Sequence, residues 1–231
     1  MKQVKNGIAY TPDSVIIESL RAIQQIRFVS ENTFVIRFDR DNLQFKAGQF
    51  VAVGIKDSLQ QREYSIYSGE KDDYIEILVR EVLGGNVSQQ LRRCEIGQLL
   101  LVSGPFGITT INDEDINSKR FIFIGSGTGI SPFHSFIRSY PTVDYTIIHG
   151  VRYVTEAYDK NDYDPHRYVL CTSRETGGNY YGRVTTFLQD YKIDPDTLFY
   201  VCGNSSMIYE VFDILRKKGV PMEHMRSEVY F

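Results

Sequence analysis

An apolar run that leads directly into a glycine-rich turn constrains the fold of this chain more than any other stretch. Residues 121–124 read Phe-Ile-Phe-Ile, and glycine follows at positions 125, 127 and 129. A short apolar run bounded by glycines is typical of a parallel strand buried on both faces. Glycines let the backbone approach a ligand, and a following helix directs free N–H groups toward an anion. The stretch predicts a strand, a turn suited to a nucleotide, and a helix.

The turn alone does not identify a nucleotide site. Its spacing is G-x-G-x-G, whereas the dinucleotide fingerprint is G-x-G-x-x-G. A tight strand-to-helix turn that needs small residues is the alternative, and the choice depends on the rest of the chain.

The pattern of strand and helix repeats beyond the turn. Strands are predicted at 145–150, 167–171 and 198–203, and helices at 151–159, 182–191 and 205–219. Strands that alternate with helices indicate a parallel, doubly wound sheet, in which ligands bind beyond the carboxyl ends of the strands. The residues at those ends are Gly125, Gly150, Thr172, Cys202 and Gly203.

The first half of the chain has a different pattern. Six short β-rich runs follow one another between residues 18 and 103: IQQIRFV, TFVIRFD, QFVAVGI, EYSIYS, YIEILVR and QLLLVS. They predict an antiparallel β-barrel or sandwich, interrupted by one helix from Val87 to about Arg93. A polar linker at 112–119 marks the boundary, so we expect a β-barrel domain at 18–111 and an α/β domain at 112–231, preceded by an N-terminal arm at 1–17.

Composition limits the possible partners. The chain has 26 basic and 29 acidic residues and a formal charge of −3, which gives no reason to expect nucleic acid or a membrane surface as a partner. Cys94, Cys171 and Cys202 are too few for a four-thiolate iron–sulfur cluster, and no metal site is expected. Sparse cysteines, together with the lack of a signal-peptide core or a long apolar run, indicate a cytoplasmic protein.

Two segments of the first half carry suitable chemistry for a phosphate and a flat ring. Arg62, Tyr64 and Ser65 offer a cation, an aromatic ring and a hydroxyl at the start of a strand, although they could also be ordinary exposed strand residues. Gly85 to Ser88 lie at the start of the predicted helix and offer N–H groups to an anion, although Asn86 could equally be an N-cap.

These segments, in this order, resemble the ferredoxin–NADP reductase family over about residues 18–231. The family's R-x-Y-S appears at Arg62–Ser65, and its small residues with Val-Ser appear at Gly85–Ser88. Its G-T-G-x-[AS]-P appears at Gly127–Pro132, its C-G-x-x-x-M at Cys202–Met207, and its E-V-Y at Glu228–Tyr230. The resemblance implies a flavin-binding barrel, a nicotinamide-nucleotide domain, and FAD and NADP as cofactors.

The resemblance also implies roles for residues of the first domain. Tyr64 would pack against the flavin ring and Ser65 would lie beside flavin N5. Arg62 would hold the pyrophosphate together with the helix start, which consists of Gly85, Asn86, Val87 and Ser88. Val79 and Arg80 would run past the cofactor.

In the second domain the resemblance places Thr128 and Cys202 on either side of the nicotinamide, next to the cofactor-binding glycines Gly127, Gly129 and Gly203. Cys202 would act by packing, and an inert core cysteine is the alternative. Glu228 would supply a carboxylate beside the nicotinamide or at the partner's entry point. The candidate catalytic residues are therefore Ser65, Cys202, Glu228 and Tyr230.

Charge favours NADPH over NADH. A 2′-phosphate needs cationic and hydroxyl donors, whereas a free ribose diol favours an acid. Ser173 and Arg174 match the family's S-R, which reads this phosphate, and Arg183 is placed to be the second cation. Surface arginines beside Glu175 are the alternative. Arg152 is a further candidate for the nucleotide phosphates, and the neighbouring His149 is expected to be a packed strand-end residue.

The carboxyl terminus departs from the plant-type pattern, which ends at a tyrosine that covers the flavin. Here Phe231 follows Tyr230. We expect Tyr230 to be the lid and Phe231 to extend toward the adenosine side. Phe231 as the lid, or an aromatic residue left in solvent, are the alternatives.

Three functions remain open from the sequence. The first is an enzyme that exchanges hydride between NADPH and FAD and single electrons with ferredoxin or flavodoxin, small acidic carriers that basic clusters at 92–93 and 216–218 would dock. The second is a stand-alone reductase component for an oxygenase or another acceptor. The third is a non-enzymatic flavin-binding redox regulator.

Overall fold

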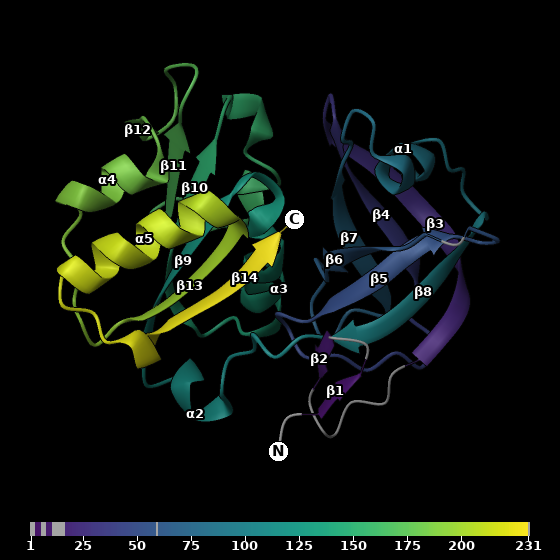
Figure 1. Cartoon of the computed structure of the whole chain (residues 1–231), viewed down its shortest axis with the longest axis horizontal. Coiled ribbons are helices and arrows are strands. Elements are labelled where there is room, and N and C mark those ends of the chain that lie inside the picture. The colour runs from purple at the N-terminus through teal and green to yellow at the C-terminus, as the bar shows by residue number, and fades with distance from the viewer. Residues whose placement is uncertain (1–2, 6–7, 11–16, 59, 231) are drawn as a thin grey trace. The chain divides into compact units, whose positions relative to one another are not determined.

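The structure is a computed structural model that describes residues 3–5, 8–10, 17–58 and 60–230. The chain forms two compact units, which Figure 1 traces in sequence colours. Unit 1 consists of Met1–Ile111 together with His134–Ser139, and unit 2 of Asn112–Phe133 together with Tyr140–Phe231. Each unit has its own six-stranded sheet.

The sheet of unit 1 is antiparallel, with the strand order β6-β5-β8-β3-β4-β7. Its strands are β3 (Ile17–Ser30), β4 (Thr33–Asp39), β5 (Phe50–Ile55), β6 (Arg62–Ser65), β7 (Tyr74–Arg80) and β8 (Leu99–Phe106). Just after β6 the chain meets β7 at a bridge between Ile66 and Ile77. The predicted antiparallel barrel is confirmed as a barrel-like sheet that is not fully closed. Near the amino terminus, β1 (Gln3–Lys5) pairs with β2 (Ile8–Tyr10).

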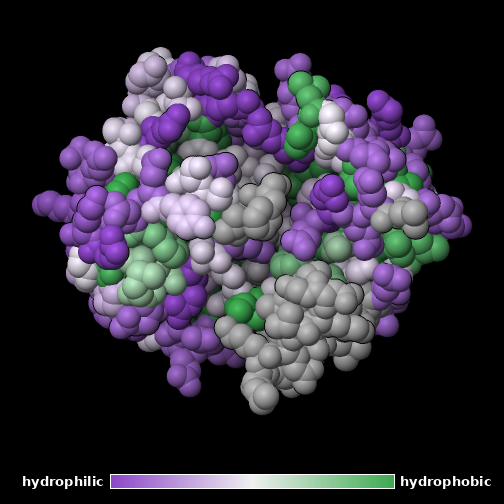
Figure 2. Space-filling view, viewed as in Figure 1, coloured by the Kyte–Doolittle hydropathy of each residue, from purple (hydrophilic) through white to green (hydrophobic). Residues whose placement is uncertain are grey.

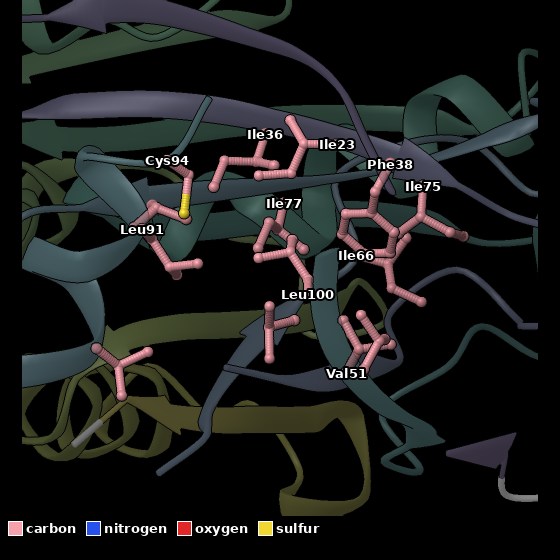
Figure 3. Packing of buried hydrophobic residues seen from close by; sticks show 14 of the residues in the cluster. Ile23, Ile36, Phe38, Val51, Ile66, Ile75, Ile77, Leu91, Cys94 and Leu100 are labelled. Carbon is pink, nitrogen blue, oxygen red and sulfur yellow. The ribbon is translucent and has the colours of Figure 1, made fainter. Parts of the chain in front are cut away.

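The core of unit 1 lies inside the curved sheet (Figure 3). Strand residues alternate between two faces, so Phe34, Ile36 and Phe38 of β4 all point into this core and are fully buried. Helix α1 (Asn86–Arg92) adds Val87 and Leu91 to the same cluster. Burial of each such side chain stabilises the fold by about 1.5–3 kcal/mol. β6, through Tyr64, and the start of α1, through Val87, therefore pack against the same core.

The sheet of unit 2 is parallel, with the strand order β12-β11-β10-β9-β13-β14. Its strands are β9 (Arg120–Ser126), β10 (Asp144–Val151), β11 (Tyr168–Thr172), β12 (Tyr180–Tyr181), β13 (Leu198–Asn204) and β14 (Met225–Tyr230). Later strands are added on both sides of β9, so the strand order reverses between β9 and β13. Ligands bind at such switch points in open α/β sheets, and the predicted doubly wound parallel sheet is confirmed.

Both faces of β9 are covered, as its apolar run predicts. Ile122 and Ile124 face a cluster built with α4 (Val184–Asp190) and α5 (Ser205–Lys217). Phe123, on the opposite face, stacks on Phe133 with ring centroids 5.1 Å apart. A strand covered on both faces needs apolar residues at every position, because neither face reaches water.

Residues His134–Ser139 of helix α3 (Ser131–Ser139) are packed into unit 1. The His134 ring stacks on Tyr67 at a centroid distance of 3.8 Å, and its Nδ1 lies 2.7 Å from the Tyr67 carbonyl oxygen. Ser135 Oγ donates to the Ser68 carbonyl at 2.7 Å. These contacts bury the segment that directly follows Ser65.

The predicted helix at 151–159 is wrong. β10 continues to Val151, and only the short 3-10 turns Val154–Glu156 and Lys160–Asp162 follow it. The Glu156 side chain accepts the backbone N–H groups of Arg152 and Tyr153, at 2.8 and 3.4 Å. Tyr153 has extended backbone angles, φ −129° and ψ 150°, so the chain leaves β10 without entering a helix. Within the polar linker expected at 112–119, a one-turn helix, α2 (Asp113–Ile116), is present.

Candidate functional site

The first group of predicted site residues lies on β6, an edge strand of unit 1. Arg62 and Glu63 are exposed, Tyr64 is partly buried against the core cluster, and Ser65 is buried. Burial raises the pKa of Tyr64 to about 12, more than Arg62 lowers it, so the phenol stays neutral. Arg62 donates to the Gln61 carbonyl at 3.0 Å, and within the described residues its other N–H groups have no protein partner. Arg62 can therefore hold an anion.

The second group surrounds the start of α1. The Val82 N–H donates to Ser88 Oγ at 3.1 Å, so the Ser88 hydroxyl proton remains available to a ligand. A Cβ added at Gly85 would lie 3.0 Å from both Ser88 Oγ and the Val82 carbonyl oxygen, which explains the glycine. Gly85, and not Asn86, is the N-cap of the helix. Asn86 instead donates to the Gln60 side chain at 3.0 Å.

Val79 and Arg80 end β7, where successive side chains point to opposite faces. Val79 is fully buried in the core cluster and Arg80 is partly buried. Of Val79, only the backbone is thus available to a cofactor, which the sequence alone does not indicate.

The glycine turn of unit 2 packs directly on the end of β13. Gly127 has φ +55°, in the region that favours glycine, and begins the 3-10 turn Gly127–Ile130 before α3. A Cβ at Gly129 would lie 2.3 Å from the Cys202 carbonyl oxygen, and one at Gly203 would lie 2.3 Å from Ser126 Oγ. Two motifs far apart in the sequence therefore meet at the switch point between β9 and β13, and only glycine fits at the contact.

The predicted catalytic residues of unit 2 lie on the two strands beyond that point. Cys202 is buried, with 1% of its surface exposed, and is paired in register with Glu228 on β14, which is partly buried. The backbone of Tyr230 pairs with Asn204. The Tyr230 side chain and Phe231, on which the lid prediction depends, lie outside the described parts of the chain.

The predicted 2′-phosphate residues differ in how far their donors are already used. The Ser173 hydroxyl donates to the Val151 carbonyl at 3.2 Å, so its proton is engaged. Arg174 and Arg183 are exposed, and the described residues provide no hydrogen-bond or ion-pair partner for either guanidinium. The Glu175 carboxylate accepts the Val154 N–H instead of pairing with Arg174. The two arginines are therefore free to bind an anion.

Arg152 is less available than the sequence suggests. Its side chain pairs with Glu156 at 2.5 Å. Burial alone would raise the pKa of Glu156, but hydrogen bonds from the side chain and backbone of Arg152 outweigh it and hold that pKa below its usual value. A phosphate at Arg152 would have to displace this carboxylate. Tyr181 is a further candidate nucleotide-binding residue, which the motifs did not indicate. It lies on β12, close to Arg183 in the sequence, and is 63% exposed.

His149 is fully buried and bonded through both ring nitrogens. Nδ1 lies 2.7 Å from the Tyr168 hydroxyl, and Nε2 lies 2.8 Å from the Gly127 carbonyl oxygen. Burial lowers the pKa of His149 to about 4, although the Gly127 hydrogen bond and the Glu156 charge both raise it. The packed strand-end residue expected from the sequence thus also supports the glycine turn.

Acid should destabilise unit 2 through His149. An unfolded histidine has a pKa of about 6.5, so the unfolded state takes up the proton first as the pH falls. The contribution of His149 to the free energy of unfolding, at most about 3 kcal/mol, is therefore complete above about pH 6.5 and is lost toward pH 4.

Urea unfolding between pH 7 and 4.5 measures this loss. The free energy of unfolding should decline more steeply with falling pH for the wild type than for His149→Gln. Equal slopes would contradict this assignment, in which Tyr158, Tyr168 and Glu156 are the titratable neighbours.

The basic cluster at 92–93 is only partly engaged. Arg92 pairs with Glu81 at 3.2 Å and lies over the Phe28 ring. Arg93 is exposed.

Figure 2 shows hydrophilic side chains over most of the visible surface, with hydrophobic ones in small groups.

The basic cluster at 216–218 is largely paired. Arg216 and Lys217 both contact Asp213, at 3.1 and 2.6 Å, and Lys218 Nζ donates to the Gln189 carbonyl at 2.7 Å. These residues act mainly as the charged carboxyl end of α5.

No helix among the described residues has the length and apolar character needed to cross a bilayer.

Two family models match consecutive parts of the chain. The family described as "Oxidoreductase FAD-binding domain" matches residues 21–111, and the one described as "Oxidoreductase NAD-binding domain" matches residues 123–212. The first includes β6 and the start of α1, and the second includes the glycine turn and Cys202.

Named relatives cover most of the chain. "Flavodoxin/ferredoxin--NADP reductase" of Buchnera aphidicola subsp. Schizaphis graminum is 26% identical, over 86% of this chain and 90% of the relative. "Toluate 1,2-dioxygenase electron transfer component" of Pseudomonas putida is 24% identical, over 86% of this chain and 63% of the relative.

The fold is shared with a solved structure, a ferredoxin NADP+ reductase from Neisseria gonorrhoeae with bound FAD and NADP. The TM-score is 0.84 at 22% identity, over 93% of this chain and 99% of that one. The paired FAD- and NAD-binding domains, the named relatives and this shared fold lead to one conclusion: the chain belongs to the ferredoxin–NADP reductase family of flavin-dependent oxidoreductases.

Proposed function

We propose that the protein exchanges hydride between NADPH and FAD, and single electrons with ferredoxin or flavodoxin. The observation that best supports NADPH is the pair of exposed arginines, Arg174 and Arg183, without a carboxylate partner in the described structure. Bound FAD would supply the chemistry, because a flavin takes up hydride at N5 and releases its electrons singly. The task of the protein is to bind and orient the two cofactors.

We assign residues 18–111 to FAD binding, with 1–17 as an N-terminal arm. Arg62 would hold the pyrophosphate by charge, and Ser88 would donate the hydroxyl proton that its contact with Val82 leaves free. Tyr64 would present a neutral ring to the flavin, and Ser65 would lie beside N5. These side chains fit a dinucleotide flavin because they offer both a flat aromatic surface and anion donors.

We assign residues 112–231 to NADP binding. The turn at Gly127–Gly129 and the segment Cys202–Gly203 would receive the nicotinamide half, with Thr128 and Cys202 on either side of the ring. Cys202 would act by packing, since its small buried side chain leaves room for a flat ring. Glu228 would supply the carboxylate, and Tyr230 would cover the flavin, with Phe231 beyond it.

Arg62→Ala should weaken FAD binding by roughly 10- to 100-fold, because a charge-assisted hydrogen bond contributes about 1.5–3 kcal/mol. The measurement is the flavin absorbance retained after gel filtration, with released FAD distinguished from FMN by its fluorescence rise on phosphodiesterase cleavage. Arg93→Ala removes the same charge from another exposed site in unit 1 and should retain flavin. Equal retention in the two variants, or a wild-type protein that takes up no FAD, would refute the flavin assignment.

The electron acceptor requires a separate test. The likeness to an electron transfer component of a dioxygenase favours a second candidate function, a reductase component that serves an oxygenase. Turnover with NADPH and cytochrome c should depend on added ferredoxin or flavodoxin if the first function is right. Rapid ferricyanide reduction without any carrier-dependent cytochrome c reduction would favour the second. Membership in an oxidoreductase family argues against a non-enzymatic regulator.

A further inference from the structure

The glycine turn at Gly127–Gly129 is anchored through its carbonyl groups. His149 Nε2 lies 2.8 Å from the Gly127 oxygen, and Ser131 Oγ donates to the Thr128 oxygen at 2.7 Å. Both anchoring side chains are almost completely buried, each with at most 1% exposed. The turn is therefore held from the protein interior.

The contacts of His149 determine its tautomer. A carbonyl oxygen carries no proton, so Nε2 must carry the hydrogen that bonds to Gly127. In the neutral ring Nδ1 is then an acceptor, and the Tyr168 hydroxyl donates a hydrogen bond to it at 2.7 Å. Tyr168 is itself buried in a stack with Tyr163, whose ring centroid is 5.0 Å away. The Gly127 carbonyl thus fixes the neutral form of His149, and the Tyr168 hydroxyl, which can donate as well as accept, satisfies the remaining ring nitrogen.

The anchor sets the direction of the N–H groups. In a trans peptide the C=O and N–H point in opposite directions, and among the described residues the only cis bond is Gly104-Pro105. Holding the Gly127 carbonyl on His149 therefore points the Thr128 N–H away from the interior. Gly127 has φ +55° and no Cβ, so the turn could otherwise adopt many conformations.

We propose that His149, whose Nε2–H donates to Gly127 while Nδ1 accepts from Tyr168, is a positioning residue that presets the Gly127–Gly129 turn for the nicotinamide half of the dinucleotide. The inference rests on the proposed function for the assignment of the two halves of NADP. The adenosine half would bind Arg174 and Arg183, which belong to other segments, so the two halves can be tested separately.

The test compares two ligands on the flavin-loaded protein by calorimetry: NADP+, which carries both halves, and 2′,5′-ADP, which carries only the adenosine half. His149→Asn retains a polar group near the Nδ1 position but cannot reach Gly127, whereas His149→Gln places an N–H near the Nε2 position. We expect His149→Asn to weaken NADP+ about tenfold and to leave 2′,5′-ADP within about twofold. His149→Gln should restore NADP+ binding to within about threefold of the wild type.

A structural defect alone would weaken both ligands equally, and that result would overturn the proposal, as would unchanged NADP+ binding in His149→Asn. Nitrogen-15 NMR of the histidine rings in the unaltered protein gives a readout that needs no variant, and an Nδ1–H tautomer for His149 would also overturn it. Arg174→Ala tests the proposed function separately. If that variant binds 2′,5′-ADP normally, the assignment of the adenosine half is wrong, whereas a normal His149→Asn would refute only the positioning role.

Discussion

Replacing Arg174 by alanine is expected to raise the KM for NADPH by roughly 10- to 100-fold and to leave the KM for NADH within about twofold. A charge-assisted bond to a phosphate contributes about 1.5–3 kcal/mol. NADH has no 2′-phosphate and does not form this bond, so its binding should not depend on Arg174. The effect should be near the top of this range, because Glu175 is bonded to the Val154 N–H and the described residues give Arg174 no other partner. Steady-state kinetics with ferricyanide as the acceptor measure both constants without a protein carrier.

Arg216→Ala is the matched control for this experiment. It removes the same charge from unit 2, but Arg216 is exposed on α5 and pairs with Asp213. Its KM for NADPH should stay within about twofold of the wild type. Similar increases for NADPH and NADH in Arg174→Ala would show that Arg174 does not read the 2′-phosphate.

Gly129→Ala is expected to have the second large effect, loss of nicotinamide-nucleotide binding with retention of FAD. The added Cβ would lie 2.3 Å from the Cys202 carbonyl oxygen and 2.7 Å from its carbonyl carbon, both backbone atoms that cannot move aside as a side chain can. Overpacking of this kind costs about 1–3 kcal/mol and shifts the backbone. The turn and the Cys202–Gly203 segment should therefore separate, and NADP+ affinity should fall at least about tenfold by calorimetry.

Gly219→Ala controls for the loss of a glycine in unit 2. Gly219 has φ +85°, which an alanine adopts only with strain, but nothing lies within 4 Å of the added Cβ. We expect it to cost about 1 kcal/mol of stability and to leave NADP+ binding unchanged. If Gly129→Ala bound NADP+ as tightly as Gly219→Ala does, the contact between the turn and Cys202 would have no role in nucleotide binding.

The order of the two sheets and the family could be predicted from the sequence, because both depend on local patterns. Continuous apolar residues at Phe121–Ile124 suit a strand covered on both faces, and alternation suits the sheet of unit 1. The pattern failed at 151–159, where β10 continues to Val151, Tyr153 is still extended, and only short 3-10 turns follow.

The availability of each candidate side chain could not be predicted in the same way. The sequence does not distinguish Arg152 from Arg174 and Arg183. In the structure Arg152 forms an ion pair with Glu156, whereas the described residues give the other two no carboxylate partner. The Ser173 hydroxyl matches a family motif, but its proton is bonded to Val151. Local spacing places a residue near a turn without determining what its polar atoms contact.

By itself, the amino-acid sequence determined that an antiparallel sheet precedes a parallel one, and which short motifs stand at their strand ends. Only the tertiary structure decided that Gly129 meets Cys202, that His149 donates to Gly127, and which arginines remain unpaired. The reason is physical: strand and turn preferences arise from neighbouring residues, whereas the partner of a buried or charged group comes from segments that approach only when the chain has folded.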